Sequence, residues 1–178
     1  MIEKAPGGRS LRHGIEGRSG MDSAATRLDS AVRALDIHDH ACLIYETPEQ
    51  QVAAIVPWVQ EGLACGDRVL YVADERTVDR VRSVLSAAGI DVAGAEATGQ
   101  LSIVTERDSY LRTGTFVPDE TIEFLEDAEA SAVRDGYRII RGCGEMSWML
   151  NGDPGAERLF EYESKLNEFA AKHRYSAL

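Results

Sequence analysis

The stretch that decides the fold is residues 42–75, CLIYETPEQQVAAIVPWVQEGLACGDRVLYVADE. It has an apolar run at 42–45, an amphipathic segment, and a second apolar run at 68–73. The amphipathic segment opens with Thr47, Pro48 and Gln50, which form a helix-capping signature. A buried strand, a helix and a second strand within about thirty residues indicate a βαβ unit of a parallel sheet.

The turn after the first strand, residues 45–51, lacks the parts of a phosphate-binding loop. Such a loop needs glycines and a lysine followed by Ser or Thr. This turn reads YETPEQQ, with no glycine, no lysine and two carboxylates that would repel a triphosphate. The unit therefore has the shape of a nucleotide-binding unit without its chemistry.

Helical and strand-like patterns alternate along the rest of the chain. We expect a leading helix over 22–35 and further helices from Thr77 to Gly89, from Pro118 to Gly136, and from Pro154 onward. We expect strands at 101–104 and 137–141, and the start of another strand at 175–178. This alternation predicts an α/β fold with a doubly wound, mainly parallel sheet and helices on both faces.

The composition limits the domain organisation and the function. A chain of 178 residues with 44% hydrophobic content suits one domain, expected over residues 21–178. Residues 1–20 show no apolar period and contain IEGR, a protease site common in expression linkers, so we expect a disordered or linker-derived leader. A net charge of -11 argues against direct contact with nucleic acid or anionic lipid.

The cysteines and the hydropathy predict a cytoplasmic protein. The three cysteines have no metal-binding spacing and do not indicate a disulfide framework. No apolar run approaches the ~18 residues needed to span a bilayer, so we expect no membrane contact.

Several motifs, in order along residues 38–178, resemble the MEDS domain, a sensory domain of methanogen and methylotroph regulators. They are HACLIYE (40–46), EGL (61–63), GDRVLYVADE (66–75), GQL (99–101), YL (110–111), Phe116 with PD (118–119), GEMSW (144–148) and EYESKLN (161–167). The resemblance implies a RecA/KaiC-like fold without a phosphate-binding loop and a role in sensing small hydrocarbon derivatives. Such domains occur fused to helix-turn-helix modules, fused to histidine kinases, or alone. By this comparison we expect no fused output module, and we expect the chain to lack the family's last strand and helix.

In open α/β sheets, ligands bind outside the carboxyl ends of the strands. The residues that we expect to line such a crevice are Tyr45, Glu46, Asp74, Glu75, Arg76, Arg141, Cys143, Glu145, Met146 and Trp148. Two other interpretations stay open: an internal arginine–carboxylate network that closes the strand ends, and an ordinary core loop around the methionine and tryptophan. No activated nucleophile accompanies the carboxylates, so we predict no enzymatic activity.

His38, His40 and Cys42 share one direction along the first strand. They are candidate metal or haem ligands, but a satisfied histidine beside an apolar thiol is the favoured interpretation, and we expect no metal and no cofactor. Glu163 and Asn167 lie one helical turn apart and could face the crevice, although a solvated helix face is the simpler account.

Three functional hypotheses follow. The first is a non-enzymatic sensory domain of a signal-transduction or transcription regulator that binds a small organic ligand. It would act with a signalling partner or an output module, and homo-oligomerisation is open. The second is a ligand-free interaction module in a signalling or sigma-factor pathway. The third and weakest is a nucleotide-binding ATPase relative.

Overall fold

The computed structural model describes Ile2–Glu3 and residues 19–178, with side chains from residue 26 onward. The helices are α1 (Ser19–Arg33), α2 (Pro48–Ala64), α3 (Val78–Ala87), α4 (Val92–Ala97), α5 (Pro118–Arg134) and α6 (Leu159–Lys172). The strands are β1 (Ile2–Glu3), β2 (Cys42–Leu43), β3 (Arg68–Ala73), β4 (Leu101–Thr105), β5 (Ile140–Gly144) and β6 (Tyr175–Ala177). Short 3-10 helices are η1 (Glu106–Asp108), η2 (Ser147–Asn151) and η3 (Ala156–Arg158). Most of the predicted leader, residues 4–18, lies outside the described residues.

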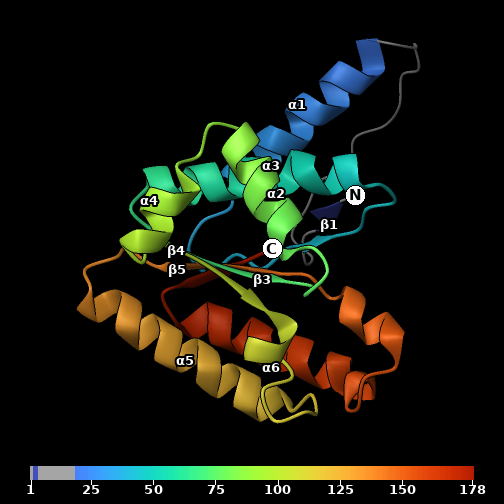
Figure 1. The fold of residues 1–178 in the computed structure, drawn as a ribbon, viewed down its shortest axis with the longest axis vertical. Coiled ribbons are helices and arrows are strands. Elements are labelled where there is room, and N and C mark those ends of the chain that lie inside the picture. The colour runs from blue at the N-terminus through green and yellow to red at the C-terminus, as the bar shows by residue number, and fades with distance from the viewer. Residues whose placement is uncertain (1, 4–18) are drawn as a thin grey trace.

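The main sheet is parallel, with the strand order β4-β3-β5-β6. Helices α2, α3 and α4 cover one face, α5 and α6 cover the other, and α1 projects beyond the sheet (Figure 1). The predicted α/β class, with a mainly parallel sheet and helices on both faces, is confirmed.

The core has two parts, one on each face of the sheet. Along β3, Tyr71 and its alternate neighbours pack against α1–α4, whereas Leu70 and Val72 pack against α5 and α6. Because successive side chains of a strand point to opposite faces, a strand covered on both sides is apolar at nearly every position. The run RVLYVA therefore folds as the central strand.

The start of α2 is as predicted. Thr47 caps the helix by accepting a hydrogen bond from the Gln50 amide, and the Gln50 side chain bonds back to the cap backbone. The helix ends before Gly66, whose φ of 75° is the left-handed conformation that glycine tolerates best.

The prediction that residues 42–45 form a buried strand of the parallel sheet is wrong. Only Cys42–Leu43 form β2, which pairs with β1, while Ile44 is 65% exposed. The residues just before β2 lie beside β6, where the Ala41 amide donates to the Ala177 carbonyl at 3.0 Å. The first crossover therefore passes over β5 and β6 before it reaches β3. The apolar side chains of 42–45 line a pocket, described below, instead of packing inside the sheet.

Three further predictions need correction. The fourth strand runs over Ile140–Gly144, three residues later than expected at its start. The sequence predicts Thr77 as the N-cap of the helix that follows it, but its side chain makes no capping hydrogen bond to α3. The apolar pattern after Pro154 predicts that Phe160 points inward, but Phe160 is 85% exposed. Within the described part of the chain, no helix combines the length and the apolar character that a membrane crossing requires.

Candidate ligand pocket

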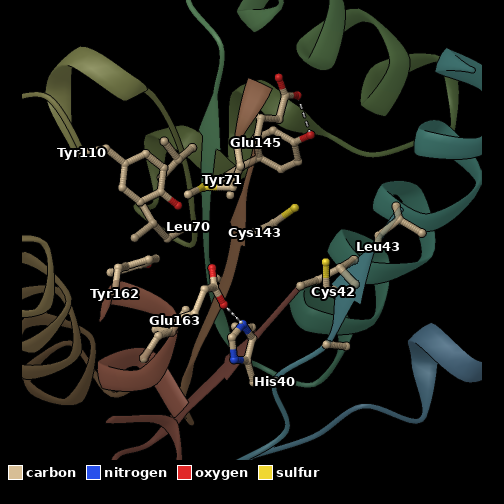
Figure 2. Close-up of a pocket in the computed structure, with 18 of the residues that line it drawn as sticks. His40, Cys42, Leu43, Leu70, Tyr71, Tyr110, Cys143, Glu145, Tyr162 and Glu163 are labelled. Carbon is tan, nitrogen blue, oxygen red and sulfur yellow. Dashed lines mark hydrogen bonds and ion pairs between the residues drawn. The ribbon is translucent and has the colours of Figure 1, made fainter. Parts of the chain in front are cut away.

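A pocket of about 620 Å³ lies at the carboxyl ends of β3 and β5. Residues 40–45 form its opposite wall, and η2 and α6 complete it. Figure 2 shows Cys42 and Leu43 on one side, Tyr110, Tyr162 and Glu163 on the other, and Cys143 between them. The volume falls within the range of about 300–1,000 Å³ that is usual for small-molecule sites.

The pocket wall is mainly apolar. Its aliphatic, thioether and phenyl side chains come from several segments and include Leu43, Ile44, Ile55, Leu70, Val72, Phe124, Leu125, Met146, Met149, Leu150, Leu159, Leu166 and Leu178. Its polar side chains are His40, Tyr45, Gln51, Tyr71, Tyr110, Thr121, Ser147, Tyr162, Glu163, Glu145 and Tyr175. Among the described residues that line it, none is a lysine or an arginine. A wall of this kind suits an apolar molecule that is oriented by a few hydrogen bonds.

Two glycines of β5 make room for tyrosine hydroxyls. A Cβ atom on Gly142 would clash with the Tyr175 hydroxyl, and one on Gly144 would clash with the Tyr110 hydroxyl. Burial raises the pKa of both phenols, and also of Tyr71 and Tyr162. The four phenols therefore stay protonated at neutral pH and keep their hydrogen-bonding hydroxyls.

The Glu145 carboxylate is only 6% exposed and accepts four hydrogen bonds. The Tyr71 hydroxyl (2.8 Å) and the Gln51 side-chain amide (3.0 Å) donate to Oε1. The Asp74 amide (3.0 Å) and the Thr77 hydroxyl (2.8 Å) donate to Oε2. Since these donors come from α2, β3 and the start of α3, one carboxylate joins these segments to the end of β5.

Asp74 and Glu75 close the end of β3 next to this carboxylate. The Asp74 carboxylate is buried, pairs with the exposed Arg76 at 2.6 Å and accepts a hydrogen bond from Ser147 at 3.0 Å. These contacts, led by the Arg76 hydrogen bond, lower the pKa of Asp74 below its ordinary value. The Glu75 amide donates to Glu106 at 2.7 Å. This arrangement includes the arginine–carboxylate contact that one interpretation of the sequence predicted.

His40 and Glu163 meet on another side of the pocket (Figure 2). His40 Nε2 lies 3.5 Å from Glu163 Oε2, and Nδ1 lies 3.0 Å from Asn167 Oδ1. Burial raises the pKa of the Glu163 carboxyl, while the charge of His40 acts in the opposite direction. Glu163 therefore faces the crevice, as its spacing on the helix allowed.

The structure brings four of the ten candidate residues into the pocket wall: Tyr45, Cys143, Glu145 and Met146. Burial raises the pKa of the Cys143 thiol, which makes it a poor nucleophile. Asp74, Glu75 and Arg76 lie beside the wall, behind Glu145.

The other three candidates lie elsewhere. The Glu46 amide bonds the Gln50 side chain, and Glu46 is absent from the described wall. Arg141 is buried against Trp58 and pairs with Asp67, which precedes β3, at 2.9 Å. Trp148 is a core residue that stacks on Tyr110, with ring centroids 5.7 Å apart.

Apart from Tyr45, the sequence did not single out the pocket tyrosines. Tyr71, Tyr110, Tyr162 and Tyr175 come from β3, the segment after η1, α6 and β6, so no local spacing links them. The usable signal was the pair Gly142 and Gly144, since alternate glycines in a strand indicate the close approach of another group.

The three metal candidates do not form a ligand set. His38 Nδ1 lies 2.7 Å from the Ala170 carbonyl, His40 contacts Asn167 and Glu163, and Cys42 is in an exposed position. Across the described residues, no group of three or more His, Cys, Asp or Glu side chains is arranged to hold a metal ion.

Comparison with known proteins identifies the family. The family described as "MEthanogen/methylotroph, DcmR Sensory domain" (MEDS) matches residues 39–178. The transcriptional repressor DcmR of Methylorubrum extorquens is 28% identical over 162 residues, which cover 90% of this chain and 58% of that protein. The chain thus spans little more than half the length of this relative. No solved structure gives a significant match. The chain belongs to the MEDS domain family.

Proposed function

We propose that this protein is the non-enzymatic sensory domain of a transcription regulator and that it binds a small organic molecule in the pocket at the strand ends. The family's description as a sensory domain and the repressor function named for the relative support a regulatory sensory role. The observation that carries the proposal of ligand binding is the apolar pocket of about 620 Å³ with its tyrosine hydroxyls and two carboxylates. We also propose that the domain works in the cytoplasm with a signalling partner or an output module.

The construction of the pocket supports a switching role. Its wall comes from residues 40–45, β3, β5, η2 and α6, which are far apart in the sequence. A ligand that contacts all of them stabilises the arrangement in which they stand close together. Because a ligand shifts an equilibrium only by its differential affinity for the two states, contact with several movable segments is what a sensor needs.

A thermal-shift screen tests this proposal. Neutral, cationic and anionic small organic molecules are added to the protein, and the midpoint of unfolding is followed as a function of concentration. At least one class should give a saturable rise, since a molecule that binds only the native state stabilises it by mass action.

Blocked variants show whether the binding is in the pocket. Cys143→Phe fills the interior of the pocket, and Leu43→Trp narrows it from the β2 side in case the first variant folds poorly. Cys65→Phe is the matched control, because Cys65 is an exposed residue at the end of α2. The rise should disappear in both blocked variants and persist in the control. A rise that survives in the blocked variants would refute the assignment to this pocket.

A second candidate function is a protein-interaction module. Leu150 is 91% exposed, Phe160 is 85% exposed, and Ile44 at the pocket wall is 65% exposed. Exposed apolar residues that gather into one patch are a feature of interaction surfaces, and Ile44 and Leu150 lie at the same pocket wall. This candidate predicts no saturable thermal shift with any small molecule and a partner that is lost on Leu150→Ser and Phe160→Ser substitution.

A further inference from the structure

Glu163 has hydrogen-bonding capacity that the described part of the protein does not use. Its carboxylate lines the pocket, and among the described residues it accepts no hydrogen bond. Its one ion-pair contact in that part of the chain is His40, at 3.5 Å. A partly buried carboxylate without donors is unfavourable, because the hydration that it loses is not replaced.

The carboxylate of Glu145, by contrast, has a structural role. It lines the same pocket, yet four donors at 2.8–3.0 Å saturate its oxygens. A ligand therefore gains little by donating to Glu145. The carboxylate that can still accept hydrogen bonds from a ligand is Glu163.

The charges around the pocket favour a cation. The described wall holds two carboxylates and no lysine or arginine, and the whole chain has a net charge of -11. The field from such a distribution attracts cations and repels anions. Tyrosine rings from Tyr110 and Tyr162 lie on the same side of the pocket as Glu163 (Figure 2), and aromatic faces attract organic cations.

We propose that the pocket selects a small apolar molecule that carries a protonated amine, and that this amine donates its hydrogen bonds to Glu163. The apolar part of the molecule lies between Leu43 of β2 and the tyrosine side of the pocket. This inference rests on the proposed function, because it names the chemical class of the ligand for the same site. Both an ammonium and an alcohol can donate a charge-assisted hydrogen bond to a carboxylate, but only the ammonium adds the attraction of its own positive charge and further N–H donors, so an amine gains more at Glu163 than an alcohol does.

Three probes with one carbon skeleton test the inference: 1-naphthylmethylamine, 1-naphthylmethanol and the carboxylate 1-naphthoate. Titration calorimetry at pH 7 gives the affinity of each for the whole chain. The amine should bind about tenfold or more tightly than the alcohol, and the carboxylate should bind most weakly.

Substitutions on α6 then show whether the amine contacts Glu163. Glu163→Gln should weaken the amine by about tenfold or more and leave the alcohol within about threefold, because only the charge is removed. Retained binding of the alcohol also shows that this variant is folded. Glu161→Gln is the matched control, since Glu161 lies on the same helix, is paired with Arg158 and is absent from the described wall. Its affinities should equal those of the unchanged protein.

The outcomes separate this inference from the proposed function. If the alcohol binds as tightly as the amine, or if Glu163→Gln leaves the amine affinity unchanged, the assignment to Glu163 is wrong while the ligand pocket stands. If none of the three probes binds saturably, the inference is overturned, and the screen with the blocked variants decides the proposed function separately.

Discussion

Removal of the Tyr71 hydroxyl should destabilise the protein well beyond what an ordinary Tyr→Phe change does. In the native structure this hydroxyl donates to Glu145 Oε1 at 2.8 Å inside the protein, where water cannot replace it. A hydrogen bond to a charged group contributes about 1.5–3 kcal/mol to the free energy of unfolding. For a chain of this size, 1 kcal/mol corresponds to about 2–4 °C, so Tyr71→Phe should lower the unfolding midpoint by about 3–12 °C.

Urea unfolding, followed by circular dichroism, measures this loss. Tyr137→Phe is the control, because the Tyr137 hydroxyl donates to the Thr98 carbonyl at 3.0 Å in an exposed position. This control should change the free energy of unfolding by no more than about 0.5 kcal/mol. A double-mutant cycle with Glu145→Gln should give a coupling energy of about 0.5–3 kcal/mol between Tyr71 and Glu145. Equal losses in Tyr71→Phe and Tyr137→Phe would refute the view that Glu145 holds the strand ends together.

Three further predictions concern residues at or beside the pocket. The Arg76 contact lowers the pKa of Asp74, so the stabilising effect of the Asp74 carboxylate is complete above about pH 4 and is lost on acidification. The difference in the free energy of unfolding between the unchanged protein and Asp74→Asn, measured by urea titration, should therefore shrink below that pH. Burial raises the pKa of Glu163, so its charged form is destabilising. Glu163→Gln should therefore increase the free energy of unfolding at pH 7, by less than about 1 kcal/mol because the side chain is 36% exposed. A gain that persists at pH 3 would contradict this. Gly144→Ala should lower the free energy of unfolding by about 1–3 kcal/mol, because the added methyl group clashes with the Tyr110 hydroxyl. In a Tyr110→Phe protein, which lacks that hydroxyl, most of this loss should disappear. Equal losses with tyrosine and with phenylalanine at position 110 would disprove the contact.

The sequence predicted the centre of the sheet closely because several local signals agree there. Residues 69–73 form an unbroken apolar run between the left-handed Gly66 and the polar Asp74, and β3 covers this run together with Arg68, as predicted. The cap at Thr47 depends only on nearby residues, so it too was predictable.

The run at 42–45 was misjudged because apolar character does not specify a neighbour. Its sequence is typical of a buried strand, but β2 contains only its first two residues and pairs with β1. The side chains of Leu43, Ile44 and Tyr45 line the pocket. A short apolar run indicates side chains that contact other apolar groups, and a pocket wall provides such contacts as well as a sheet does.

The site was predictable where it follows from the ends of parallel strands. That rule placed Glu145 beside Asp74, and the two are joined by a hydrogen bond of 3.0 Å. The rule did not identify Tyr110 or Tyr162, because they reach the pocket through the packing of the segment after η1 and of α6 against one face of the sheet. Contacts between distant segments depend on tertiary packing, which local spacing does not encode.

The methyl signals of the methionines test the central claim most directly. Met146 and Met149 line the pocket, and the chain has four methionines, so labelled methyl groups give a simple spectrum that Met→Leu variants can assign. In a titration with 1-naphthylmethanol, or with the strongest compound of the thermal-shift screen, the Met146 and Met149 signals should shift saturably while the others stay in place. Saturable binding that leaves these two signals unchanged would contradict a ligand site at the carboxyl ends of β3 and β5.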